Sequence, residues 1–152
     1  MAIGLSHGGT NVYSSKERAR QLWIATKDGL VLDERADGGK WREARRALRG
    51  QHISSIIFEP NSGTMFAGSF FGSVSASADG GITWERRDNG ITIHDVYSLA
   101  SNVVDGKVRI YAGTEPAHLF VSEDLGDHWI ELPSLRAVPT TSKWSFPAPP
   151  HV

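Results

Sequence analysis

Two stretches, Ser77-Ala-Asp-Gly-Gly-Ile-Thr-Trp84 and Ser122-Glu-Asp-Leu-Gly-Asp-His-Trp129, decide which fold to expect. Their short polar side chains can bond the backbone of a tight turn, glycine permits positive φ, and the tryptophan supplies a large ring to bury. One Asp per turn falls far short of the roughly six to eight oxygen ligands of calcium, so we expect structural turns. The residues expected to hold them are Ser77, Asp79, Gly81, Thr83 and Trp84, and Ser122, Asp124, Gly126 and Trp129.

These turns belong to a repeat. The stretch Asp37-Gly-Gly-Lys-Trp41 is a shortened first copy that lacks the serine. Three markers share one spacing: Trp41, Trp84 and Trp129 (43 and 45 residues apart), Ala25, Ala67 and Ala112 (42 and 45), and His52 and His94 (42).

A period of about 40 to 45 residues, with strand-like segments between Gly, Asn and Asp turns, is typical of four-stranded propeller blades. We therefore expect an all-β fold, a β-propeller of four-stranded antiparallel blades with about 3.5 blades present. The single domain 1–152 divides into blade 1 at about 1–49, blade 2 at about 50–92, blade 3 at about 93–137 and the start of blade 4 at about 138–152.

Individual strands are expected from the same alignment. In blade 1 these are 21–26, 30–33 and 40–43, with Ala2–Ser6 as a candidate first strand. In blades 2 and 3 they are 53–58, 64–69, 73–77 and 83–87, then 95–101, 108–114, 118–122 and 128–132, and 143–147 would open the fourth blade.

Composition excludes several classes of function. Sixteen Lys and Arg against seventeen Asp and Glu give a net charge of −1, so neither a nucleic acid nor a membrane surface is expected as a partner. The run 40–49 is basic, but we interpret it as a strand end and solvated connector, because no matching basic face exists elsewhere. The absence of cysteine leaves the redox compartment undetermined. Without a leader or a long apolar segment, the expected location is cytoplasmic. No metal site and no organic cofactor are expected.

The turns and the repeated Ala-Gly-Ser/Thr strands resemble the bacterial BNR/Asp-box proteins, which are often labelled glycosyl hydrolase or sialidase-like. A more distant resemblance is to photosystem assembly-factor-like propellers. Residues 112–122 and 144–152 are similar to the bacterial group in particular. Members usually have about twice this length, enough for a closed ring, so the resemblance covers an N-terminal half. Either the chain is a fragment, which is the simpler interpretation, or copies pair as a homodimer that completes the ring.

If the Asp boxes join the third and fourth strands of each blade, the second-to-third-strand turns and the connections between blades lie at the opposite end. Propellers usually place ligands there. The candidate ligand-binding residues are Asp28, Phe70, Phe71, Glu115, His118, His52, His94 and Trp144. An exposed aromatic among them could stack on a sugar. The alternative is a structural role: the histidines would form hydrogen bonds that end a strand, and Glu115 would accept backbone N–H groups of its turn.

The resemblance raises the question of catalysis. A sialidase-like hydrolase needs an arginine cluster and carboxylates on both sides of the scissile bond, and no Phe/Tyr-Arg-Ile-Pro motif is present. The acids near the expected site are Asp28, Asp95 and Glu115, and no spacing pairs them. We expect a non-catalytic propeller that binds a small molecule, glycan or protein. The alternatives are half of a carbohydrate-active glycoside hydrolase, with catalytic residues unknown, and an assembly-factor-like scaffold.

Overall fold

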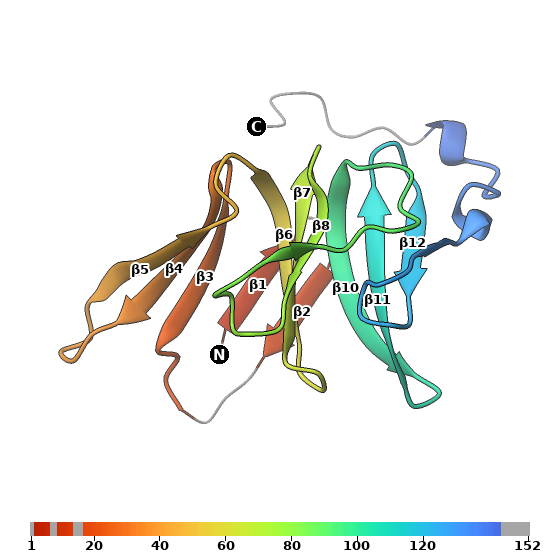
Figure 1. Cartoon of the computed structure of the whole chain (residues 1–152). Helices are drawn as coiled ribbons and strands as arrows, with labels where there is room; N and C mark the ends of the chain where they lie inside the picture. Colours follow the sequence, from red (N-terminus) through yellow and green to blue (C-terminus); the bar gives the residue numbers. More distant parts are fainter. Residues whose placement is uncertain (1, 7–8, 14–16, 144–152) are drawn as a thin grey trace.

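The chain forms β-sheets, and the computed structural model describes it over residues 2–6, 9–13 and 17–143 (Figure 1). Over these residues three antiparallel sheets of three or four strands follow one another along the chain. The helical elements there are two 3-10 turns, η1 (Pro133–Leu135) and η2 (Thr141–Lys143). The expected all-β class is therefore confirmed. None of the described helical turns is long and apolar enough to cross a bilayer.

Each sheet is built from strands that are consecutive in the chain and paired in chain order. The first sheet contains β3 (Gln21–Thr26), β4 (Gly29–Arg35) and β5 (Trp41–Ala47). The second contains β6 (His52–Glu59), β7 (Thr64–Phe70), β8 (Ser73–Ser77) and β9 (Glu85–Arg86). The third contains β10 (Val96–Val104), β11 (Lys107–Thr114), β12 (Leu119–Ser122) and β13 (Ile130–Glu131).

The second sheet lies between the other two (Figure 1). Residues 64–69 and all of β8 are buried, which places apolar or small side chains on both faces, whereas β3 of the first sheet is mostly exposed. The second and third sheets approach each other so closely at position 68 that this residue must be glycine. A Cβ there would come within 2.8 Å of Val96 Cγ1 in the third sheet.

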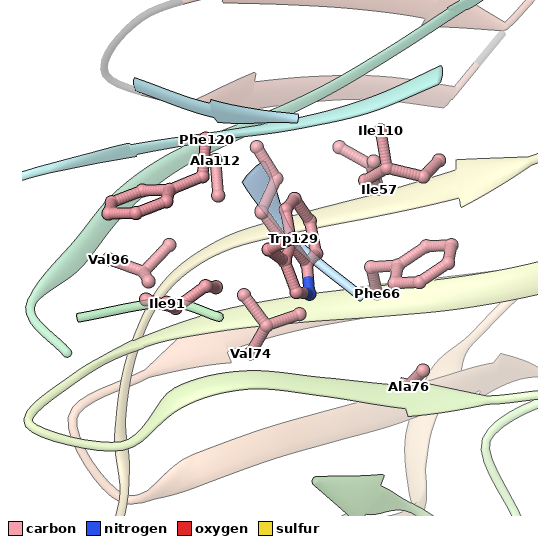
Figure 2. Close-up of a cluster of buried hydrophobic side chains, with 11 residues drawn as sticks. Ile57, Phe66, Val74, Ala76, Ile91, Val96, Ile110, Ala112, Phe120 and Trp129 are labelled. Atoms are coloured by element: carbon pink, nitrogen blue, oxygen red, sulfur yellow. The ribbon is translucent and has the colours of Figure 1, made fainter. Parts of the chain in front are cut away.

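Two clusters of buried side chains join the sheets. The larger one fills the space between the second and third sheets (Figure 2) and comprises Ile57, Phe66, Val74, Ala76, Ile91, Val96, Leu99, Ile110, Ala112, Phe120 and Trp129. The smaller one, between the first and second sheets, contains Leu30, Ile53 and Ala67, with Trp23 and Trp84 packed against them. Each large side chain buried in this way stabilises the fold by about 1.5 to 3 kcal/mol.

The N-terminal strand pairs differently from the expectation. β1 (Ala2–Ser6) is a strand, but it pairs with β2 (Gly9–Tyr13), not with β3, so the first sheet has three described strands. Only two residues separate β1 from β2 in sequence, a length that favours a hairpin over a distant partner. β1 lies against β6, and β2 against β10.

The repeat of the first sheet is shifted by one residue from the expected alignment. Trp23 packs edge-on against Trp84, so it faces the second sheet, and its neighbour Ile24 faces away. Ala67 faces the first sheet, because it belongs to the cluster between the two. Ile24, not Ala25, is therefore the counterpart of Ala67. Their separation, 67 − 24 = 43, equals the tryptophan spacing of these repeats.

Each of the three larger sheets contains a β-bulge that the sequence analysis does not predict. Ser54 and Tyr97 are the extra residues in β6 and β10, at corresponding places in the second and third sheets. Ala44 is the extra residue in β5. A bulge re-aims nearby side chains, and the one at Tyr97 has a direct effect on the candidate site.

Candidate ligand-binding rim

One end of the sheets brings together the β3–β4, β7–β8 and β11–β12 turns with the connections from each sheet to the next. We call this end the rim; these three turns point the same way in Figure 1. The Gly29 N–H donates to the Gln51 carbonyl oxygen at 2.7 Å, and the Ser73 N–H donates to that of His94 at 3.0 Å. At the rim, backbone hydrogen bonds therefore join the β3–β4 and β7–β8 turns to the connection that leads to the next sheet.

Four aromatic side chains form a cluster at the centre of this rim. Phe70 stacks on His52 with ring centroids 5.5 Å apart and an interplanar angle of 22°. Tyr97, on the β10 bulge, meets Phe70 edge-on at 5.3 Å, and Phe71 does the same at 5.9 Å. Three of the predicted residues, His52, Phe70 and Phe71, are thus brought together. We call the four residues the aromatic cluster.

Phe71 is the exposed member of the aromatic cluster. Its side chain is 82% exposed, and its φ is 61°, in the left-handed region that bulky residues rarely adopt. The Phe71 N–H donates to Asp95 Oδ1 at 2.8 Å. The Glu115 N–H donates to the Asp95 carbonyl oxygen at 3.0 Å. Asp95 therefore links the β7–β8 turn to the end of β11 and fixes the backbone under the exposed ring.

The acids of the rim have different surroundings. Asp28 Oδ1 accepts the Gly50 N–H at 2.7 Å, so this carboxylate, like that of Asp95, bonds a backbone amide. Glu115 is exposed and precedes Pro116 through a cis peptide bond. Both Asp28 and Asp95 therefore have a role in holding a turn.

The two remaining predicted histidines contact carboxylates outside the aromatic cluster. His118 Nδ1 lies 2.9 Å from Glu131 Oε1, and its ring stacks on Phe120 at 6.2 Å. The Arg136 guanidinium, followed by the His118 ring, holds the pKa of Glu131 below its usual range despite partial burial. His94 Nδ1 lies 3.6 Å from Asp88 Oδ2. Trp144, the last predicted residue, lies outside the described residues.

The basic run 40–49 is largely β-strand. β5 extends to Ala47, so Arg45 and Arg46 belong to the strand and not to the connection after it. Arg46 forms a bidentate pair with Glu43, at 2.8 and 2.7 Å. This pair reduces the charge that the run presents to solvent.

The turn 77–84, at the opposite end of the sheets, is held by its own side chains. Ser77 Oγ donates to Asp79 Oδ1 and accepts the Gly81 N–H, both at 2.8 Å. Asp79 also accepts from the Thr83 hydroxyl at 2.6 Å and the Thr83 N–H at 2.9 Å. These bonds, with that from Thr83 the strongest, hold the pKa of Asp79 far below its usual range. The carboxylate is an ionised acceptor used within the turn.

The turn 122–129 repeats this arrangement with one substitution. Ser122 Oγ donates to Asp124 Oδ1 and accepts the Gly126 N–H, both at 2.8 Å. His128 stands where Thr83 stands in the other turn, and its Nδ1 lies 2.9 Å from Asp124 Oδ2. Burial raises the pKa of Asp124, but the hydrogen bonds from His128 and Ser122 outweigh it and lower the pKa.

Over residues 2–6, 9–13 and 17–143, no three His, Asp or Glu side chains gather closely enough to hold a metal ion. No family model matches the chain, and neither does any curated protein. The rim must therefore be interpreted from its own residues.

Sequence reasoning missed Tyr97 as part of the aromatic cluster and Asp95 as the support of Phe71. Alternation along β10 could not locate Tyr97, because the bulge shifts the register by one residue. The signal available for Asp95 was its place beside His94 in the connection, where a short carboxylate can bond a facing turn.

Proposed function

We propose that the three sheets are successive blades of an Asp-box type β-propeller and that the chain binds a carbohydrate at the rim without cleaving it. Phe71 provides the stacking surface, because an exposed aromatic face fits the apolar side of a sugar ring. Asp95 keeps that ring in place.

The observation that carries this proposal is the conformation of Phe71. A bulky residue at positive φ costs about 1 to 3 kcal/mol, and it persists where its surroundings determine it. Here the Asp95 carboxylate holds the Phe71 amide at 2.8 Å, and the ring rests edge-on against Phe70. The fold thus accepts a less favourable backbone conformation, and a smaller free energy of folding, in order to expose an apolar ring to solvent.

The state of the acids favours binding over hydrolysis. Glycosidases use two carboxyl groups that flank the scissile bond. At the rim, the carboxylates of Asp28 and Asp95 accept backbone N–H groups at 2.7 and 2.8 Å, and each supports a turn. Asp28 and Glu115 are both exposed, but the Asp28 carboxylate is already used to hold its turn, which leaves Glu115 as the acid that could act on a ligand.

The experiment is a titration of the isotope-labelled chain with a panel of neutral oligosaccharides, followed through backbone amide resonances. A bound sugar should shift the amides of residues 70–73 and 95. Phe71→Ala should abolish these shifts. Phe58→Ala is the matched control, because Phe58 is 41% exposed near the opposite end of β6 and should leave binding unchanged.

Two results would contradict the proposal. Absence of any shift at the rim across the panel would overturn the carbohydrate assignment. Release of new reducing ends from an oligosaccharide, lost on Glu115→Gln, would replace binding by the glycoside hydrolase alternative.

A further inference from the structure

The contact between the first and second sheets and the contact between the second and third sheets are copies of one interface. In each, an aromatic ring of one sheet, on β3 or β7, faces the glycine of the next sheet's turn. Trp23 contacts Gly81 in this way, and Phe66 Cε1 lies 3.3 Å from the place where a Cβ on Gly126 would stand. The tryptophan that ends each turn packs alongside, as Trp129 does in Figure 2.

Within the described residues, one half of this interface lacks its partner half on the first sheet. On the first sheet, three side chains face away from the second sheet: Leu22, Ile24 and Trp41. Their counterparts are, in the same order, Met65, Ala67 and Trp84 on the second sheet and Ile110, Ala112 and Trp129 on the third. On the first sheet these side chains are 41%, 37% and 42% exposed, whereas on the third sheet they are 0%, 0% and 4% exposed. We call Leu22, Ile24 and Trp41 the outer face of the first sheet.

The glycine that belongs to this half is also uncovered. Gly38 precedes Trp41 by three residues, as Gly81 and Gly126 precede their tryptophans, and its φ of 92° matches the 91° of Gly126. A Cβ on Gly38 would meet nothing within 4 Å. The place that an aromatic ring fills at the other two turns is open here.

The other half of the interface lacks its partner half on the third sheet, as far as the structure describes the chain. In the third sheet Tyr111 stands at the position that Phe66 and Trp23 occupy in the other two; it follows Phe66 by 45 residues. Tyr111 pairs with Val121 on the neighbouring strand β12. Val121 pairs in turn with Ile130, which is 70% exposed. Because directly paired residues point to the same side of a sheet, these three residues share the side turned away from the second sheet. We call them the outer face of the third sheet.

We propose that copies of this chain associate head to tail, with the outer face of the first sheet of one copy packed on the outer face of the third sheet of another. The occupant is a second copy because each face is the half that the other lacks, in an interface the chain already forms twice. Tyr111 would then lie over Gly38 as Phe66 lies over Gly126. Such a heterologous contact closes into a ring if the rotation allows, and otherwise extends.

The test compares three isoleucine-to-arginine variants of the full chain by light scattering across a concentration series. Ile24→Arg places a charge on the outer face of the first sheet, and Ile130→Arg does so on that of the third. Ile82→Arg is the matched control, since Ile82 is 63% exposed at the tip of the 77–84 turn and belongs to neither face. Circular dichroism establishes that each variant is folded.

The wild type and Ile82→Arg should reach at least twice the mass of one 16.6 kDa chain, and Ile24→Arg and Ile130→Arg should each remain at that of one chain. Mixing these two variants should restore a species of two chains, because one intact face of each kind is then available.

Three results would overturn the proposal. The first is a wild-type chain that stays monomeric throughout the series. The second is association lost in one face variant only, which would mean that like faces pair. The third is association that survives in both face variants. None of these outcomes depends on carbohydrate binding at Phe71, so the two proposals fail independently.

Discussion

The indole Nε1 of Trp129 donates to the backbone carbonyl oxygen of Arg87, 42 residues earlier in the chain, at 3.0 Å. The same tryptophan is 4% exposed and donates its backbone N–H to Asn89 O at 2.8 Å. A residue that ends a turn of the third sheet is therefore bonded to the connection that follows β9 of the second sheet. Trp84 instead bonds Gly81 of its own turn, at 3.3 Å.

Trp129→Ala should reduce the free energy of unfolding by about 3 to 5 kcal/mol, because it removes a buried ring from the larger cluster. Trp41→Ala, at a corresponding but 42% exposed position, should cost much less. Urea denaturation of both variants measures the difference. Equal losses would mean that the burial of Trp129 contributes little.

Gly81→Ala should destabilise the chain more than Gly80→Ala. Both residues have positive φ, 81° and 72°, so both substitutions carry a backbone cost of about 1 to 2 kcal/mol. Only at Gly81 would the new methyl group clash with the Trp23 ring, which adds about 1 to 3 kcal/mol; at Gly80 nothing lies within 4 Å. Thermal denaturation of the pair separates the two costs. Similar melting temperatures would contradict the contact.

Phe71→Gly should be more stable than Phe71→Ala by about 1 kcal/mol, because glycine accepts the φ of 61° without strain. Both variants lose the same exposed ring, so the comparison isolates the backbone. Chemical denaturation gives the two free energies. If alanine is as stable as glycine here, the left-handed conformation stores no strain.

Asp79→Asn should destabilise the chain at neutral pH, and its deficit relative to wild type should shrink as the medium becomes acidic. The pKa of Asp79 is depressed in the folded state, first by the Thr83 hydrogen bonds, so its contribution is complete above the unfolded pKa of about 3.9. That contribution is lost as pH falls below the unfolded pKa and through the lower pKa of the folded state. Urea titrations at several pH values follow the change. A pH-independent deficit would exclude a role for the charge.

Much of the strand pattern could be predicted from the sequence. The expected strands 64–69 and 73–77 correspond to β7 and β8, and 21–26 to β3. The cause is local: tryptophan-ended turns and glycine mark strand ends, and each turn's hydrogen bonds lie within eight residues. The partner of β1 was missed because the sequence analysis expected no strand at residues 9–13, where β2 lies.

The site was predicted less completely. Placing His52, Phe70 and Phe71 at one end followed from strand order alone. The support of Phe71 by Asp95 depends on a contact between residues 24 apart, one in the β7–β8 turn and the other in the connection before β10. The one-residue shift of the first repeat escaped detection because Ala25 and Ala67 stand in similar sequences while facing opposite sides of their sheets.

The unequal clusters imply that the chain does not open as one cooperative unit. Of the residues whose burial the structure describes, eleven buried ones join the second and third sheets, whereas three join the first sheet to the second. Local opening requires less free energy where fewer apolar contacts are broken. Amide protons of β3 to β5 should therefore exchange with solvent through fluctuations that leave β6 to β13 intact, which makes the connection at residues 48–51 the hinge of partial unfolding.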